Sequence, residues 1–278
     1  MQPGARRGFN PKTEGMIMLK AILSYAFAAG VAIAATTAPS MAAADDLQTI
    51  KTAGTFKFAN SGAYPPFSFV NDKNEVVGFD VDIGNEIAKR LGVKGVGVST
   101  AWDGIIAGLL ASKYDSIIGS MTITAERQKA VDFVGPYYHS GRGVFVAEGS
   151  PIKSLDDLKG KSIGVTLGET HEKWARERGG WDVHTYKGLP ELFLELKAGR
   201  VQAIIVDNIP VAVAIKDTGE KIRKLDTPNI DGGADSIGIA IRKGNPELKA
   251  AMQKALDDMM ADGTYAAIST KWIGTDIR

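Results

Sequence analysis

The chain contains no cysteine, and it is poor in histidine, in aromatic residues and in net charge. It has 278 residues, of which three are histidines and 8% are aromatic, and its formal net charge at pH 7 is +1. Without cysteine no disulfide can form, so stability has to come from a large buried core. The near-zero charge argues against nucleic acid as a partner. The 44% share of hydrophobic residues suits one large or two modest globular domains.

Signals of metal or catalytic chemistry are also lacking. His139, His171 and His184 do not have the spacing of metal ligands, and Thr170-His171-Glu172 is not a helical zinc pair. The sequence shows no paired nucleophile and base and no glycine-rich phosphate loop. It therefore predicts no metal, no cofactor and no catalytic residue.

The first 44 residues have a composition of their own. Four basic residues precede an apolar run, Ala21–Ala35, and small residues follow it. This order is typical of a secretory signal peptide, and the run is shorter than the roughly 20 apolar residues of a membrane-spanning helix. We expect cleavage after Ala42 or Ala44, with translation starting at Met1 or at an internal Met16 or Met18. A retained N-terminal anchor is the alternative.

The residues beyond this segment are expected to form a nearly neutral exported protein. Loss of residues 1–42 removes four of the 33 basic residues and one of the 32 acidic residues, which leaves a net charge of −2. No cysteine follows the apolar run, so we do not expect a lipoprotein. We predict a monomer that is free in the periplasm.

Strands and amphipathic helices alternate after the leader. Residues 55–59 alternate as a strand does, Phe79–Leu91 carries an apolar stripe at spacing four, and Tyr114–Ser120 is a second apolar strand. The same rhythm returns from about residue 154 and ends with Gln202–Val206. This repetition predicts an α/β protein with two open sheets, each flanked by helices.

Two segments rich in β-formers are suited to cross between the two units. They are Tyr137–Ala147 and Ala234–Ile241. Two crossings make one lobe discontinuous and place a hinge between the lobes. We therefore expect lobe 1 to comprise residues 45–139 and 234–278, and lobe 2 to comprise residues 140–233.

Polar residues stand where apolar strands end. The stretch GSMTITAERQ, Gly119–Gln128, follows one strand with hydroxyls and one arginine, and Asp207 follows another. Open sheets bind ligands beyond the carboxyl ends of their strands, so the two sets are expected to face a common cleft. The planar fork of Arg127 matches a carboxylate, and an ammonium group would complement the carboxylate of Asp207.

Each of these residues also has an ordinary structural interpretation. Arg127 could lie on a helix surface, and Asp207 could cap the following helix. Tyr64 and Trp102 could wall a ligand or fill the core. The segment 168–170 could attract an anion at a helix N-terminus or form a capped loop. The residues alone leave these alternatives open.

Several blocks of sequence resemble the amino-acid-binding proteins of bacterial importers, solute-binding protein family 3. They include GFDVDIGNEIAKRL at Gly78–Leu91, AWDGIIAGLLASKYDSIIGSMTITAERQKAVDFVGPYY at 101–138, LKGKSIGV, LKAGRVQAIIVD and ADGTYAAISTKWIG. The resemblance covers essentially the whole chain after the leader. It implies a two-lobed periplasmic-binding-protein fold of type II that closes on a free amino acid and docks on an ABC permease.

The resemblance also implies roles for individual residues. Arg127 would hold the α-carboxylate, assisted by Thr122 and Thr170. Asp207 would take the α-ammonium, together with Ser120 and Thr122. The implied side-chain pocket and backbone contact involve three further residues: Tyr64, Trp102 and Gly119.

Two positions depart from common members of the family. Ser61 stands where binders of basic side chains often carry an acidic residue. Glu169 occupies a position that is usually small or hydroxylic. It could pair with an amine-bearing or otherwise polar side chain, with a hydrogen bond from His171 beside it, or it could point to solvent. We expect a pocket for a polar amino acid.

Three functions remain in competition at this point. The first is a transport receptor without enzymatic activity. The second is an exported cyclohexadienyl or arogenate dehydratase on the same scaffold, in which Glu169 would act as a general acid. The third is the ligand-binding core of a sensor or channel, which would need an output domain or a membrane helix that the sequence does not display.

Overall fold

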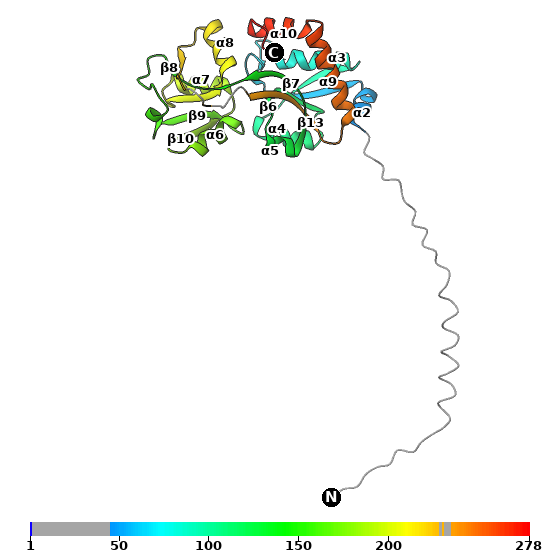
Figure 1. Cartoon of the computed structure of the whole chain (residues 1–278), viewed down its shortest axis with the longest axis horizontal. Coiled ribbons are helices and arrows are strands. Elements are labelled where there is room, and N and C mark those ends of the chain that lie inside the picture. Colours follow the sequence, from blue (N-terminus) through cyan, green and yellow to red (C-terminus); the bar gives the residue numbers. More distant parts are fainter. Residues whose placement is uncertain (2–44, 228–229, 231–234) are drawn as a thin grey trace, which may run out of the picture. The chain divides into compact units, whose positions relative to one another are not determined.

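The computed structural model describes residue 1, residues 45–227, residue 230 and residues 235–278. The predicted signal peptide and both cleavage sites lie outside these residues. No helix in the described ranges is long and apolar enough to cross a membrane. The chain from Asp45 onward belongs to one compact unit of alternating helices and strands (Figure 1).

The first five-stranded sheet has the order β5-β1-β6-β13-β7. Strands β5 and β6 flank β1 in parallel, whereas β13 pairs antiparallel with both β6 and β7. The five strands in chain order are β1 (Thr55–Asn60), β5 (Lys94–Ser99), β6 (Ser116–Thr122), β7 (Val131–Ser140) and β13 (Asp235–Arg242).

The second five-stranded sheet has the order β10-β9-β11-β8-β12. Its first three strands are parallel, and β8 pairs antiparallel with β11 and β12. In chain order they are β8 (Arg142–Ala147), β9 (Ser162–Thr166), β10 (Asp182–Tyr186), β11 (Ala203–Asp207) and β12 (Ile222–Lys224). A small antiparallel sheet of β2 (Ala63–Tyr64), β3 (Ser68–Val70) and β4 (Val76–Val77) precedes helix α3.

The two large sheets belong to two lobes, as the α/β pattern predicts. The chain passes from the first sheet to the second between Ser140 and Arg142, and β13 in the first sheet follows β12 in the second. The second passage includes residues 228–229 and 231–234, which lie outside the described ranges. The limits that we assign to the lobes stay a proposal.

Helices cover both faces of each large sheet. On the first sheet, buried side chains of α3 such as Ile83 and Ile87 join one core cluster, and Ile105 and Leu109 of α4 join another. On the second sheet α7 and α6 take the corresponding places. The helices are α2 (Asp46–Ala53), α3 (Phe79–Arg90), η1 (Trp102–Gly104), α4 (Ile105–Leu110), α5 (Ala125–Ala130), η2 (Asp156–Leu158), α6 (Thr170–Arg178), α7 (Leu189–Lys197), α8 (Asn208–Thr218), α9 (Pro246–Ala261) and α10 (Thr264–Ile273).

One predicted helix is shorter than its apolar stripe indicates. The sequence predicts a helix over Gly104–Lys113, but α4 ends at Leu110, and η1 precedes it. Ser112 adopts a left-handed conformation with φ of 56°, which ends the helix. The following strand β6 starts at Ser116 and ends at Thr122, two residues later at each end than the predicted strand Tyr114–Ser120.

Candidate functional site

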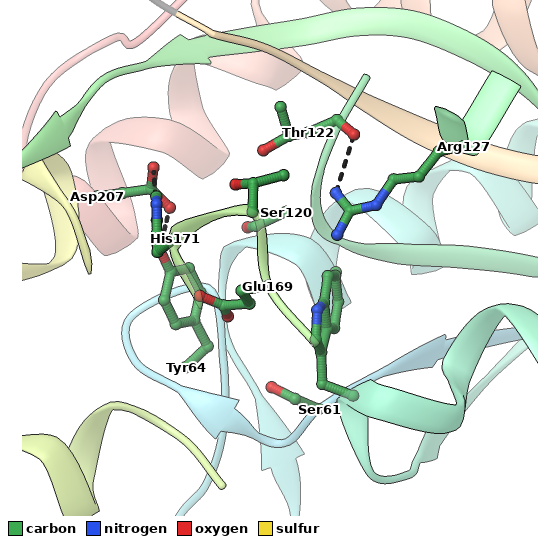
Figure 2. Close-up of a pocket in the computed structure, with 11 residues that line it drawn as sticks. Ser61, Tyr64, Ser120, Thr122, Arg127, Glu169, His171 and Asp207 are labelled. Atoms are coloured by element: carbon green, nitrogen blue, oxygen red, sulfur yellow. Dashed lines mark hydrogen bonds and ion pairs between the residues drawn. The ribbon is translucent and has the colours of Figure 1, made fainter. Parts of the chain in front are cut away.

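One enclosed pocket lies between the two large sheets and is lined by side chains from both lobes (Figure 2). Its cavity volume is about 20 Å³, so the side chains of the two lobes nearly fill the space between them. Its eleven lining residues are Ser61, Tyr64, Trp102, Gly119, Ser120, Thr122, Arg127, Glu169, Thr170, His171 and Asp207. The nine residues predicted as ligand-binding are all among them, together with Ser61 and His171.

The carboxyl ends of strands supply most of this lining. Strand β6 contributes Gly119, Ser120 and Thr122, and β11 ends at Asp207. Helix α6 begins just after β9 and brings Glu169 and its neighbours to the same place. The carboxyl ends of these strands therefore meet at one pocket, as the sequence predicts. The role of each residue stays a proposal.

Ser120 is held in an unusual backbone conformation by two buried side chains. Its φ is 59°, in the left-handed region. Its hydroxyl donates to Asp80 over 2.8 Å, its backbone N–H donates to the Tyr137 hydroxyl over 3.0 Å, and that hydroxyl donates to Asp80 over 2.6 Å. Burial raises the pKa of Asp80 to about 6, against the lowering effect of these two hydroxyl donors. Asp80 and Tyr137 therefore shape the strand end from behind.

Arg127 presents a guanidinium to the pocket. Thr124 caps the short helix α5 by accepting from the Arg127 backbone N–H, and Arg127 Nη1 donates to the Thr122 carbonyl over 3.0 Å. Its guanidinium carbon lies 5.7 Å from the centroid of the Trp102 ring. Within the described ranges no carboxylate forms an ion pair with Arg127. Burial lowers the pKa of this arginine, and Glu169 and Glu126 act in the opposite direction.

Asp207 faces the pocket from the other lobe. Its Oδ2 accepts a short hydrogen bond from the Tyr64 hydroxyl, and its Oδ1 lies 3.5 Å from His171 Nε2. It stands at the N-cap position directly before α8 but makes no capping hydrogen bond with its side chain, so the capping alternative is wrong. Burial raises the pKa of Asp207, but His171 and Tyr64 lower it by more, so the net shift is downward.

One residue near Asp207, Arg142, was not selected from the sequence. Arg142, at the start of β8, donates from Nε to His171 Nδ1 over 3.1 Å, and its guanidinium lies 5.0 Å from the ring of Trp174. Burial lowers the pKa of His171, but the Asp207 carboxylate raises it by more. A series of contacts thus runs from Arg142 of β8 through His171 to Asp207 at the pocket.

The two aromatic residues serve both of the roles that the sequence allows. Tyr64 is 6% exposed and stacks on Phe67 at 5.5 Å between ring centroids, and Trp102 is 9% exposed. Both belong to hydrophobic clusters and also line the pocket. They can therefore form rigid walls for a ligand.

The lobes touch at three places around the pocket besides the Tyr64–Asp207 bond. A Cβ built on Gly188 would lie 2.5 Å from the Ala63 carbonyl oxygen, and one on Gly168 would lie 2.9 Å from the Asp103 Cα. At the surface, Lys173 Nζ of α6 lies 2.9 Å from a carboxylate oxygen of Glu126 of α5. The pocket is therefore closed in this structure.

The chemistry of this pocket is that of binding a dipolar molecule. A guanidinium without a carboxylate partner and a buried carboxylate lie on opposite lobes. In the described ranges no group of three or more His, Asp or Glu side chains could hold a metal ion. The fold and the pocket define a two-lobed protein that encloses a small polar ligand between its lobes.

The chain belongs to the bacterial extracellular solute-binding proteins, family 3, whose family model matches residues 56–275. It is 38% identical over 269 residues to the L-cystine-binding protein TcyJ of Escherichia coli K12, which covers 95% of this chain and 97% of that protein. It is 34% identical over 268 residues to the lysine/arginine/ornithine-binding periplasmic protein of the same organism, covering 94% and 99%.

Solved structures agree with this assignment. An arginine-binding protein mutant from T. maritima superposes with a TM-score of 0.76 at 34% identity, covering 82% of this chain and 99% of that one. An ancestral amino acid-binding protein, described as a precursor of cyclohexadienyl dehydratase, gives the same TM-score and coverage at 36% identity. The two-lobed α/β fold expected from the sequence is confirmed.

Proposed function

We propose that this protein is a periplasmic receptor that captures a polar amino acid between its lobes and delivers it to an ABC-type membrane permease. The observation that carries the proposal is the pair formed by Arg127 on lobe 1 and Asp207 on lobe 2, which face one pocket. A free amino acid is the smallest common metabolite with a carboxylate and an ammonium at matching ends. The amino-acid-binding relatives support the same ligand class.

In this proposal the pocket grips the ligand at three places. Arg127 binds the α-carboxylate, with the Thr122 N–H and Thr170 assisting. Asp207 binds the α-ammonium, with the Ser120 carbonyl and the Thr122 hydroxyl. The side chain lies between Tyr64 and Trp102, and Gly119 allows the ligand to approach the backbone of β6. Because the ligand contacts both lobes only when they are closed, binding favours closure.

The proposed receptor function implies a location outside the cytoplasm. Residues 1–44 act as a cleaved signal peptide, and the mature protein is a periplasmic monomer without a lipid anchor. The permease contacts the outer rims of both lobes. The periplasmic names of relatives such as the lysine/arginine/ornithine-binding protein support this location.

We propose further that the protein is not an enzyme. The dehydratase alternative rests on Glu169 as an acid in the pocket and on the likeness to a dehydratase precursor. Incubation of the pure protein with prephenate or arogenate separates the two functions. Formation of an aromatic product above a Glu169→Gln control would establish the enzyme and refute a pure receptor.

A thermal-shift panel of the common amino acids, with cystine and ornithine added, tests the receptor function. A ligand present at one hundred times its dissociation constant adds about 2.7 kcal/mol of apparent stability, which is readily measured. We expect at least one polar amino acid to raise the melting temperature. If none does so, the proposed function is wrong.

A further inference from the structure

Glu169 is the one pocket residue whose charge the α-amino and α-carboxyl groups of an amino acid leave unmatched. It occupies the position before α6, where side chains commonly cap the helix, yet its side chain makes no capping hydrogen bond. The nearby Gly168 N–H donates instead to the carboxylate of Glu172 over 2.8 Å. The Glu169 carboxyl, which has the Thr166 hydroxyl as a hydrogen-bond partner, therefore points into the pocket instead of capping α6 (Figure 2).

Within the described ranges no lysine, arginine or histidine lies within ion-pair distance of this carboxyl. Desolvation raises the pKa of Glu169 to about 7, and Asp207 adds to the rise, whereas His171 and Arg127 oppose it. Glu169 is half-buried, and a carboxylate withdrawn from water without a cationic partner is costly, so the site favours any group that supplies a positive charge.

An amino acid with a neutral side chain would make this imbalance worse. Its α-carboxylate would take the charge of Arg127, which together with His171 partly offsets Glu169. Its α-ammonium would be matched by Asp207. Glu169 would then be left as a half-buried carboxyl that has to take up a proton or remain without a cationic partner.

The neighbouring residues at this end of the pocket do not compete with a ligand's cation for Glu169. Ser61 is neutral, and its hydroxyl already accepts from the Ala63 N–H over 3.2 Å. Figure 2 shows Glu169 between Tyr64 and Ser61, with Arg127 on the other side. Aromatic faces such as those of Tyr64 and Trp102 are also favourable neighbours for a cationic group.

We propose that Glu169 selects amino acids that carry a second positively charged group beyond the α-carbon. This inference rests on the proposed receptor function. Two kinds of group can supply this second positive charge. One is a basic side chain, and the other is the second ammonium of a dimeric amino acid such as cystine.

Calorimetric titration with matched ligand pairs tests the inference and separates the sources. L-arginine is compared with L-citrulline, which has the same length without the charge, and L-cystine with S-methyl-L-cysteine, which lacks the second ammonium. We expect the charged member of at least one pair to bind about 30-fold tighter or more, because a buried ion pair depends strongly on both partners. The pair with the larger ratio identifies the source of the charge.

Two variants assign the preference to Glu169. In Glu169→Gln the ratio for that pair is expected to fall below about five-fold, since a neutral amide no longer demands a cation. Glu177→Gln makes the same change on an exposed position of α6 and keeps the wild-type ratio. A preference that survives in Glu169→Gln overturns the inference. Tight but equal binding within both ligand pairs also overturns the inference, but it leaves the proposed receptor function intact. No binding to any amino acid overturns the inference and the receptor function together.

The pH dependence of affinity provides a second readout. A cationic ligand favours the ionised form of Glu169, so its affinity should rise from about pH 6 to about pH 8, whereas a neutral ligand should show the opposite trend. The titratable groups that face Glu169 are Arg127, Asp207, His171 and Tyr64. His171 can titrate in the same range. The part of the pH dependence of affinity that reports on Glu169 is therefore the part that disappears in Glu169→Gln. An unchanged slope in that variant contradicts the inference.

Discussion

The two lobes are built on the same plan. Each sheet has three parallel strands followed by two that pair antiparallel, and each presents polar residues at the carboxyl end of an inner strand. The charges that the two lobes present to the pocket differ in sign. Lobe 1 supplies hydroxyls, aromatic rings and the guanidinium of Arg127, whereas lobe 2 supplies the carboxylates of Asp207 and Glu169.

This difference explains how one plan can bind a dipolar ligand. Two identical strand ends would present the same charge twice, and neither lobe alone can satisfy both ends of an amino acid. Both charged ends of the ligand are matched only when both lobes contact it. The opposite charges of the lobes therefore make closure depend on whether a ligand is bound. The predictions below weaken one side of this arrangement at a time.

The largest effect is expected for Arg127→Ala on lobe 1. It removes two parallel charge-assisted hydrogen bonds, each worth roughly 1.5–3 kcal/mol, so affinity should fall at least 100-fold. Calorimetry measures the loss, and circular dichroism checks the fold. Arg200→Ala, which alters an exposed arginine of lobe 2, should bind like the wild type. Undiminished affinity in Arg127→Ala would mean that the carboxylate end is assigned incorrectly.

The counterpart on lobe 2 is Asp207→Asn. Loss of the charge leaves a buried ammonium without its counter-ion, which typically costs about 2 kcal/mol or more and corresponds to roughly a 30-fold loss. The amide still accepts one hydrogen bond, so the effect should be smaller than that of Arg127→Ala. Asp182→Asn, at an exposed aspartate of the same lobe, serves as the control. Equal affinity of both variants would contradict the role of Asp207.

A third change tests contact between the lobes without altering any charge. The methyl group of Gly188→Ala would lie 2.5 Å from the Ala63 carbonyl oxygen, so it should prevent full closure and lower affinity about 10-fold. Small-angle scattering with saturating ligand should show a larger radius than for the wild type. Gly149→Ala adds a methyl group to open space in the same lobe and should change neither quantity. A normal radius in Gly188→Ala would show that the lobes do not need this approach.

The smallest effect is expected for Lys173→Met. Its ion pair with Glu126 joins the lobes but is exposed to solvent, so its loss should weaken binding by no more than about five-fold. The remaining effect should disappear at high salt, where the charges are screened. Lys159→Met on the surface of lobe 2 controls for the general loss of charge. A loss as large as that of Gly188→Ala would mean that this pair contributes far more than exposed pairs usually do.

The fold and the lining of the pocket could be predicted largely from local patterns. Apolar strands that end in hydroxyls or in a carboxylate indicated where β6 and β11 would meet at one pocket, because the direction of a strand fixes the edge at which its end lies. Helix boundaries were less accurate. Helix α4 ends at Leu110 rather than at Lys113, because the end of a helix depends on local backbone conformation such as that of Ser112.

The supporting residues could not be predicted in this way. Asp80 acts on Ser120 from forty positions away, and Arg142 reaches His171 from a different element. Nothing in their own sequence neighbourhoods signals these contacts. The left-handed conformation of Ser120 is also invisible beforehand, since serine rarely adopts it.

The hydrogen bond from Tyr64 occupies one oxygen of the Asp207 carboxylate, which we propose as the partner of a ligand's ammonium. On that proposal an amine has to displace a phenol, so only the surplus of a charged hydrogen bond over a neutral one contributes to binding. Simple amines that cannot also engage Arg127 would gain little from this exchange. The tyrosine would then favour complete amino acids over monofunctional amines.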